Sequence, residues 1–298
     1  MGKADLHCHT NFSGITHLLR IPFPESVTPP EKMVDRAIKS NLDVISITDH
    51  NEIKGAYRAK KYTKQNNLEM DVVIGEEITT SDGELLGLFI QEIIPPFKTV
   101  EESIDLIHEQ GGLAVAPHPY SYYCLSLGDK IKKLNLDGVE ILNGFHRDPY
   151  VNKLAEQHAL SSLAQVGGSD AHSTILLGMT YTEFYGKSGE ELYQCIKKRQ
   201  TKPRGNPAYL RQCILWSMEI PYAVMKTLLA PWRTNELENN DPLKRVSRMK
   251  KHNKAVAFCG CLLYIGTPLP YICGIISEGV ARYKAKKKWC ENSITLIN

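Results

Sequence analysis

Apolar and polar residues alternate in blocks along the first two thirds of the chain, and the period changes from block to block. Short runs rich in β-branched residues predict buried strands, and the segments between them carry apolar residues at helical spacing. Met33, Val34, Ala37 and Ile38, for example, form one helical face. The expected strands are 4–6, 42–48, 71–75, 85–90, 113–116, 138–142 and 164–166, and the expected helices are 30–40, 100–110, 150–159 and 190–199.

This alternation of strands and helices predicts an α/β fold. Right-handed crossovers would arrange the strands in parallel, in a barrel or an open sheet. Folds of this kind place their functional residues at the C-terminal ends of the strands. Polar side chains directly after the expected strands are therefore the candidates for a functional site.

Histidines and carboxylates stand at these positions. A His-x-His pair in an extended segment points both imidazoles to the same side, because side chains repeat every two residues. A carboxylate among the imidazoles could bridge two cations. The candidate metal ligands are His7, His9, His50, Glu77, His118, Asp170 and His172. Nitrogen and oxygen ligands suit Zn, Mn or Fe.

A site with two or three such divalent ions would supply a metal-bound hydroxide at neutral pH, and it would clamp the attacking and leaving oxygens of a phosphate ester. We expect His7, His9, Glu77 and Asp170 to form its catalytic centre. Asp5 and Asp49 flank ligands, and two interpretations stay open for them. They could orient imidazoles as hydrogen-bond acceptors, or they could only close local turns.

Charge and cysteine content indicate which partners and which cellular compartment to expect. The net charge of +3 gives no case for a nucleic-acid partner. The eight cysteines form no CxxC pair, which favours reduced thiols. No secretory signal is recognisable. We therefore expect a cytoplasmic protein.

The composition changes after Pro203, which predicts a catalytic unit over residues 1–203 and a helical extension over 204–298. Segment 255–277 carries no charge, basic residues flank it on both sides, and Thr267 to Pro270 break it near the middle. Two half-helices of this length could dip into a membrane and return, in a peripheral or re-entrant association. The alternative is a buried helical hairpin packed on the barrel.

Five motifs in this order resemble the PHP (polymerase and histidinol phosphatase) family. They are Asp5-Leu6-His7-Cys8-His9-Thr10, Ile47-Thr48-Asp49-His50-Asn51, Gly75-Glu76-Glu77-Ile78, Pro117-His118-Pro119 and Gly168-Ser169-Asp170-Ala171-His172. The resemblance implies a distorted (β/α)7 TIM-like barrel with phosphoesterase activity. It also implies that His7, His9, Glu77 and Asp170 hold one metal. Glu77 would bridge to a second metal at His118, and His50 and His172 would serve a third.

Two departures from the family pattern concern the ligand set. Gly14 and Ile15 stand where the family usually has an Asp or His. Glu84 precedes Leu85-Leu86-Gly87, where the family often has a histidine, so we expect Glu84 to substitute as a carboxylate ligand. His17 lies in the long loop of residues 13–29 and could supply a ligand in place of the Asp or His that is missing at Gly14 and Ile15.

The leading hypothesis is metal-dependent hydrolysis of a phosphate ester, with a phosphomonoester favoured. The expected partner is a small-molecule phosphate ester or a lipid-linked phosphate. Basic residues that could bind the phosphate are Lys54, Arg147, Arg204 and Arg211. One alternative is a non-catalytic regulatory PHP-like module. Another is a C–N hydrolase of the amidohydrolase type, which normally bridges its metals with a lysine where this chain offers Glu77.

Overall fold

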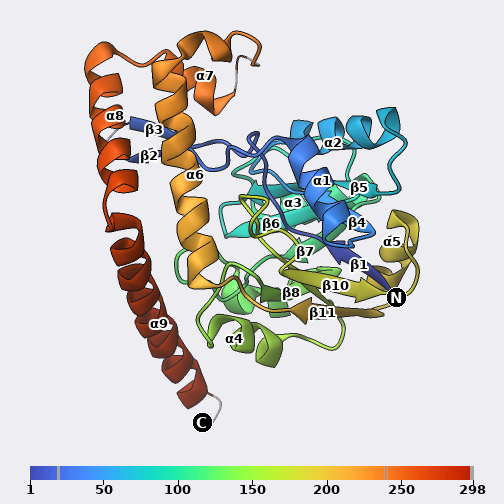
Figure 1. Cartoon of the computed structure of the whole chain (residues 1–298). Helices are drawn as coiled ribbons and strands as arrows, with labels where there is room; N and C mark the ends of the chain where they lie inside the picture. The colour runs from blue at the N-terminus through green and yellow to red at the C-terminus, as the bar shows by residue number, and fades with distance from the viewer. Residues whose placement is uncertain (19–20, 238, 240, 296–298) are drawn as a thin grey trace.

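The computed structural model describes residues 1–18, 21–237, 239 and 241–295. A nine-stranded sheet curves into a nearly closed barrel, and helices pack around it (Figure 1). The sheet order is β11-β10-β1-β4-β5-β6-β7-β8-β9. Its strands are β1 (Gly2–Asp5), β4 (Val44–Ile47), β5 (Asp71–Thr79), β6 (Glu84–Leu88), β7 (Leu113–Ala116), β8 (Gly138–Asn143), β9 (Ala164–Gly168), β10 (Thr180–Phe184) and β11 (Thr201–Gly205).

Helices follow most of these strands; the sequence predicts four of them, and α2 is additional. They are α1 (Pro30–Lys39), α2 (Lys54–Gln65), α3 (Val100–Glu109), α4 (Val151–His158) and α5 (Gly189–Lys197). Helices α3 and α5 begin with full capping boxes, Thr99 with Glu102 and Ser188 with Glu191. A small hairpin of β2 (Ile15–Leu18) and β3 (Ile21–Pro24) rises from the loop after β1. The α/β barrel class with a helical C-terminal region is thus confirmed.

The expectation that the strands run parallel is wrong at β6, and the expected set lacks β10 and β11. Strand β6 pairs antiparallel with both β5 and β7. The connection from β5 is only residues 80–83, and so short a loop can join only antiparallel neighbours. As a result, β6 starts at the rim where the parallel strands end. Strand β10 is antiparallel to β1 and to β11.

Side chains of β10 help to close the barrel. The Thr180 hydroxyl donates to the Gly168 carbonyl of β9 at 2.7 Å, and the Thr182 hydroxyl donates to the Gly167 carbonyl at 2.8 Å. These bonds tie the first strands of the sheet to the last one. The C-terminal ends of β1, β4, β5, β7, β8 and β9 therefore surround one opening.

The core follows the two-residue period of the strands. Along β7, Leu113 and Val115 join one apolar cluster, and Ala114 and Ala116 join the other. The larger cluster packs helices α1 to α4 against the sheet, and the smaller one includes Leu192 and other residues of α5. Neighbouring residues thus serve opposite faces of the sheet, which fixes the register and with it the position of every strand end.

Among its described residues, the C-terminal region has four α-helices: α6 (Leu210–Leu229), α7 (Pro242–Ser247), α8 (Lys251–Gly266) and α9 (Leu269–Thr295). Helices α8 and α9 lie along α6, at the side of the barrel (Figure 1). The domain boundary predicted after residue 203 falls within β11, and the division into two domains stays a prediction.

The apolar segment of the C-terminal region bends at the break that the sequence predicts. Within the described residues, no single helix is long and apolar enough to cross a membrane. Helix α8 and residues 269–288 satisfy the length and composition criteria together, with a bend of 82° between them. Their apolar side chains are largely exposed, Leu263 by 58% and Ile276 by 60%. The alternative of a buried hairpin is therefore wrong.

Candidate metal centre

The candidate ligands meet at the rim of the barrel. His7 and His9 follow β1, His50 follows β4, and Glu77 lies near the end of β5. His118 follows β7, and Asp170 and His172 follow β9. Their ligand atoms fall into overlapping groups in which all atoms lie within 4.8 Å of one another. The groups are His7–His9–Asp170, His7–Glu77–His118, His9–His50–His172, His50–Glu77–Glu84 and Glu84–His118–Cys124.

The carboxylate of Glu77 is the centre of this arrangement. Its Oε2 atom lies 3.2 Å from Nε2 of both His7 and His9, and 3.3 Å from Nδ1 of His50. Its Oε1 atom lies 3.1 Å from Nε2 of His118. The carboxylate is almost fully buried. Because both oxygens face imidazoles from different strands, Glu77 has the position that a bridging ligand needs.

Asp170 provides the second buried carboxylate. Its Oδ1 atom lies 3.5 Å from Nε2 of His7, 3.3 Å from Nε2 of His9 and 3.7 Å from Nδ1 of His172. The backbone φ of Asp170 is +52°, in the left-handed region that aspartate tolerates better than most residues. This conformation turns the chain at the end of β9, so that Asp170 faces the centre.

Glu84 reaches the same centre from the opposite chain direction. It is the first residue of β6, and its Oε2 atom lies 3.8 Å from Nε2 of His118. Because β6 is antiparallel, its start coincides with the rim. Burial, followed by repulsion from Glu77, raises the pKa of Glu84 to about 8. A carboxyl held so close to Glu77 needs a nearby cation to ionise at neutral pH.

The protonation of the centre reflects a balance between burial and charge. Burial opposes a charge on His7, but Asp170, Glu77 and Glu140 outweigh it and raise the pKa of His7 well above its usual value. Burial also opposes the charge on Glu77, yet His7 and His50 hold the pKa of Glu77 well below its usual range. The centre is therefore built to hold positive charge between its carboxylates.

The residues fit divalent cations. Nε2 of His9 is buried and lies close to Glu77 and Asp170, yet it has no hydrogen-bond partner within the described part of the chain. A cation bound between His9, Glu77 and Asp170 would give each of these three groups a partner. The donors are imidazole nitrogens and carboxylate oxygens, which suit Zn, Mn or Fe.

Two other residues, and not Asp5 or Asp49, orient the imidazoles. Oε1 of Glu140 lies 3.2 Å from Nδ1 of His7, and the Ser13 hydroxyl lies 2.8 Å from Nδ1 of His9. Asp5 instead accepts from the backbone N–H groups of Ser169 and Gly178. Asp49 accepts from the N–H and hydroxyl of Thr10. These bonds join segments 39 to 173 positions apart in the chain, so the expectation that the two aspartates only close local turns is wrong as well.

Besides Ser13, three residues of the centre are absent from the sequence-based set. Glu140 lies in the middle of the apolar strand β8, and a lone charge in such a strand is a signal that could have revealed it. His146 follows β8, and its ring lies 5.9 Å from that of His118. Neither of its ring nitrogens has a hydrogen-bond partner among the residues described. Cys124 joins the group of Glu84 and His118.

Other candidates lie outside the centre. His17 is exposed in β2 and joins none of the ligand groups formed by the described residues. Arg147 pairs with Glu278 at 3.0 Å, and Arg204 with Glu183 at 2.7 Å. Lys54 pairs with Glu52, and Arg211 is exposed at the start of α6. A role of these bases at a phosphate stays a prediction.

Gly168 allows β9 to pack closely against β1 beside the metal centre. A Cβ atom at this position would lie 2.5 Å from Cβ of His7 and 2.7 Å from Oε1 of Glu140. Such distances are far shorter than normal van der Waals contacts. Any side chain here would push apart the pair that orients the first imidazole, so the backbone of β9 can approach β1 only because residue 168 is glycine.

Relatives share much of the chain. A protein of Methanocaldococcus jannaschii, described as uncharacterized, is 49% identical over 163 residues, which are 55% of this chain and 94% of that protein. Another uncharacterized protein of the same organism is 31% identical over 61% of this chain and 70% of its own length. A 5'-3' exoribonuclease of Haemophilus influenzae is 25% identical over 47% of this chain and 45% of its own.

A solved structure shares the fold. It is a two-domain protein from Bacteroides vulgatus that contains a predicted PHP-like metal-dependent phosphoesterase, with a TM-score of 0.55 and 19% identity. The match covers 68% of this chain and 64% of that one. The profile of the PHP domain matches residues 5–201, which include all eight candidate ligands. The chain therefore belongs to the PHP domain family.

Proposed function

We propose that this protein hydrolyses a phosphate ester, with a phosphomonoester as the favoured class, at a centre of two or three divalent metal ions. The observation that supports this most directly is the Glu77 carboxylate, whose two oxygens face four imidazoles from three strand ends. A buried carboxylate in this position suits two neighbouring cations, which is the arrangement used to clamp a phosphate.

Each candidate ligand has a place in the proposed centre. His7, His9, Asp170 and Glu77 would hold one ion. Glu77, His118 and Glu84 would hold a second, and His50 and His172 a third. When bound, these ions would activate water and neutralise charge on the phosphate oxygens. The protein itself holds the imidazoles in place, through Glu140 at His7 and Ser13 at His9.

Two alternatives predict different results. A regulatory module would bind metal without turnover. A C–N hydrolase of the amidohydrolase type would act on an amide or a related bond. The bridging position occupied by Glu77 and the near-complete ligand set favour the phosphoesterase. The Haemophilus influenzae relative is named as an exoribonuclease, and the bonds that link RNA nucleotides are phosphate diesters.

The test uses the full chain, stripped with a chelator and reloaded separately with Mn, Zn or Fe. Release of phosphate from a panel of phosphomonoesters is measured beside cleavage of diesters and of amide substrates. His9→Ala is compared with His108→Ala, a control on α3 that pairs with Asp137. We expect phosphate release with at least one metal, and a loss of about 100-fold or more in His9→Ala alone.

The outcomes separate the three hypotheses. Metal binding without turnover of any substrate would support the regulatory module. Turnover confined to amides would support the C–N hydrolase. Equal activity in His9→Ala and the parent would exclude the proposed centre.

A further inference from the structure

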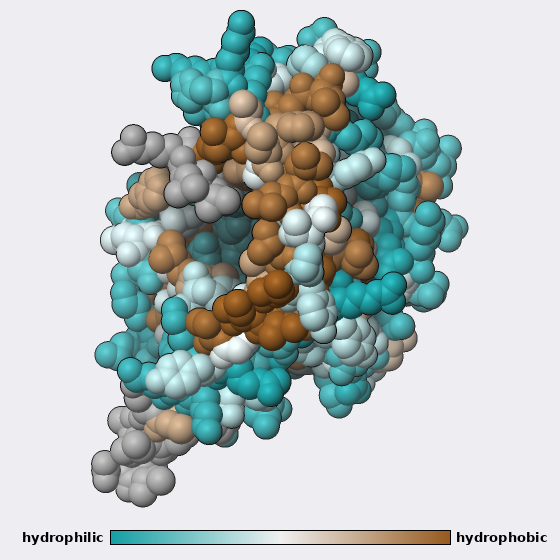
Figure 2. All heavy atoms as spheres, turned by 60° about the vertical axis from the view of Figure 1, so that its left-hand side comes forward, coloured by the Kyte–Doolittle hydropathy of each residue, from teal (hydrophilic) through white to brown (hydrophobic). Residues whose placement is uncertain are grey.

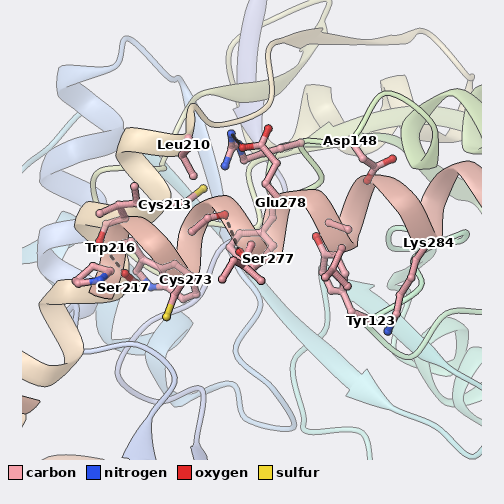
Figure 3. Close-up of a pocket in the computed structure, with 18 of the residues that line it drawn as sticks. Tyr123, Asp148, Leu210, Cys213, Trp216, Ser217, Cys273, Ser277, Glu278 and Lys284 are labelled. Carbon is pink, nitrogen blue, oxygen red and sulfur yellow. Dashed lines mark hydrogen bonds and ion pairs between the residues drawn. The ribbon is translucent and has the colours of Figure 1, made fainter. Parts of the chain in front are cut away.

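An apolar cavity lies between the barrel rim and the C-terminal helices. Its volume is about 680 Å³, which is in the range of pockets that hold small organic ligands. Tyr122, Tyr123 and Phe145 line it from the barrel loops, and Trp216 lines it from α6 (Figure 3). Residues of α9 such as Ile276 complete it. The cavity thus exists only because the C-terminal helices stand against the rim.

The cavity shares a wall with the candidate metal centre. The His172 ring lies 6.3 Å from the Phe145 ring and 5.9 Å from the Trp216 ring. On the other side, Tyr123 stacks on His146 at 4.7 Å, and His146 in turn neighbours His118. A ligand whose polar end lies at the centre could therefore extend its other end into the cavity.

Two pairs of polar groups in the cavity wall are engaged with each other: Arg147 pairs with Glu278, and the Tyr264 hydroxyl donates to Ser217 at 3.0 Å. Within the described residues, the Tyr122 hydroxyl, Oδ2 of Asp148 and Nε1 of Trp216 are buried without a hydrogen-bond partner. The wall is nevertheless mostly apolar, so a hydrocarbon in this space gains from burial. The wall therefore favours an apolar group.

We propose that the cavity receives the hydrocarbon part of a phosphate monoester of an apolar alcohol, such as a long alkyl or isoprenyl chain, while the phosphate lies at the metal centre. This inference rests on the proposed function. In the reaction, the oxygen of water forms a new bond to phosphorus, and the bond between phosphorus and the alkoxy oxygen breaks. The alkoxy oxygen takes a proton, which leaves inorganic phosphate and the free alcohol.

Such an ester could reach the site from solution or from a bilayer. Figure 2 shows hydrophobic side chains gathered in a band on the face that carries α8 and α9, beside a hollow. Leu262 and Leu263 on α8 are more than half exposed, as is Ile276. The surface next to the cavity is therefore itself apolar, and the experiment includes both sources of substrate.

The test measures kcat/KM for phosphate release by the metal-loaded full chain on n-alkyl phosphates from ethyl to decyl, each below the concentration at which it aggregates. Decyl phosphate in phosphatidylcholine vesicles provides the second source. We expect kcat/KM to rise by up to about fourfold for each added methylene until the cavity is full. A higher rate from vesicles than from solution would assign the bilayer as the source, and the reverse would assign solution.

Two cavity variants and one control sharpen the result. Ile276→Asp puts a charge in the wall, and Ser277→Trp fills the space. Both residues are exposed enough for the chain to fold with the new side chain. Each should flatten the dependence on chain length. Ile93→Asp, at a site that is 45% exposed and lies outside the cavity lining, should preserve it.

Failure of this inference differs from failure of the proposed function. Turnover that does not change with chain length in the parent protein would overturn the apolar site and leave the phosphoesterase intact. Absence of turnover on every phosphate ester would overturn the function and the substrate together. Calorimetry with decylphosphonate and ethylphosphonate then decides whether the cavity binds hydrocarbon at all, since equal affinities would exclude it.

Discussion

Oε1 of Glu140 lies 3.2 Å from Nδ1 of His7, inside the barrel and away from water. The other oxygen of Glu140 accepts from the backbone N–H of His118 at 2.9 Å and from the side chain of Asn143 at 2.9 Å. One carboxylate thus fixes the imidazole that follows β1 and the start of the loop after β7. A partner of this kind sets the tautomer of a metal ligand.

Glu140→Gln should weaken metal binding without unfolding the barrel. Both carboxylate oxygens accept hydrogen bonds, so the amide NH2 of glutamine must face a donor on one side. We expect the affinity for Mn or Zn to fall by about 10- to 100-fold. Metal titration by calorimetry measures this change, with Glu183→Gln on β10 as the control. An affinity equal to that of the parent protein would contradict the orienting role.

Glu77→Gln and Glu76→Gln form a matched pair on one strand. Glu77 faces the imidazoles, whereas Glu76 points to the opposite face and accepts from the Ile94 N–H at 2.8 Å. Removing the bridging charge should reduce bound metal and lower phosphate release by about 100-fold or more. Glu76→Gln should keep both. Elemental analysis after gel filtration, together with the phosphate assay, reads out the difference.

A similar loss in both variants would mean that the strand, and not the bridge, is the sensitive element.

Removal of metal should lower thermal stability. A ligand that binds only the folded state at 100 times its Kd stabilises that state by about 2.7 kcal/mol. In a chain of 298 residues, that corresponds to a Tm rise of about 4 °C. Scanning calorimetry of chelated and Mn-loaded protein should show the rise, and Glu77→Gln should not. An unchanged Tm in the parent protein would argue against a buried metal centre.

The barrel rim could be predicted because its signals are local. A buried strand followed by a polar residue is visible at Val44 to His50 and at Leu113 to His118. The alternation of the pleat then places neighbouring side chains on opposite faces. The structure brings all eight proposed ligands together at one rim. Their roles at a metal stay predictions.

Contacts between distant segments could not be predicted in this way. The pairing of Glu140 with His7 joins residues 133 positions apart, and the lone charge of Glu140 in an apolar strand does not identify its partner. His146 stands outside the expected strands, yet the loop after β8 turns it back toward His118. The direction of β6 depended on the length of a loop and not on the composition of the strand.

Association with a membrane stays a hypothesis that the exposed apolar side chains of α8 and α9 support. Basic residues at Lys250, Lys251 and Lys254 precede this surface, and others follow it, which favours anionic lipid. We expect the full chain to float with vesicles that contain phosphatidylserine. The double variant Leu262→Glu, Leu263→Glu should bind several-fold less, whereas Ile93→Glu should bind as the parent.

Flotation is measured by recovery in the lipid fraction of a density gradient. Recovery of all protein in the dense fractions, with and without anionic lipid, would exclude the hypothesis.

The missing side chain at position 168 has a consequence for anyone who alters this protein. Strand β9 cannot be varied at Gly168 without disturbing two other strands at once, since the vacant volume is shared by His7 and Glu140. Even the single methyl group that Gly168→Ala adds would displace His7 and Glu140. Substitutions meant to change the surroundings of the centre therefore belong in the helices beyond the rim, where they alter the cavity wall and leave the positions of the candidate ligands untouched.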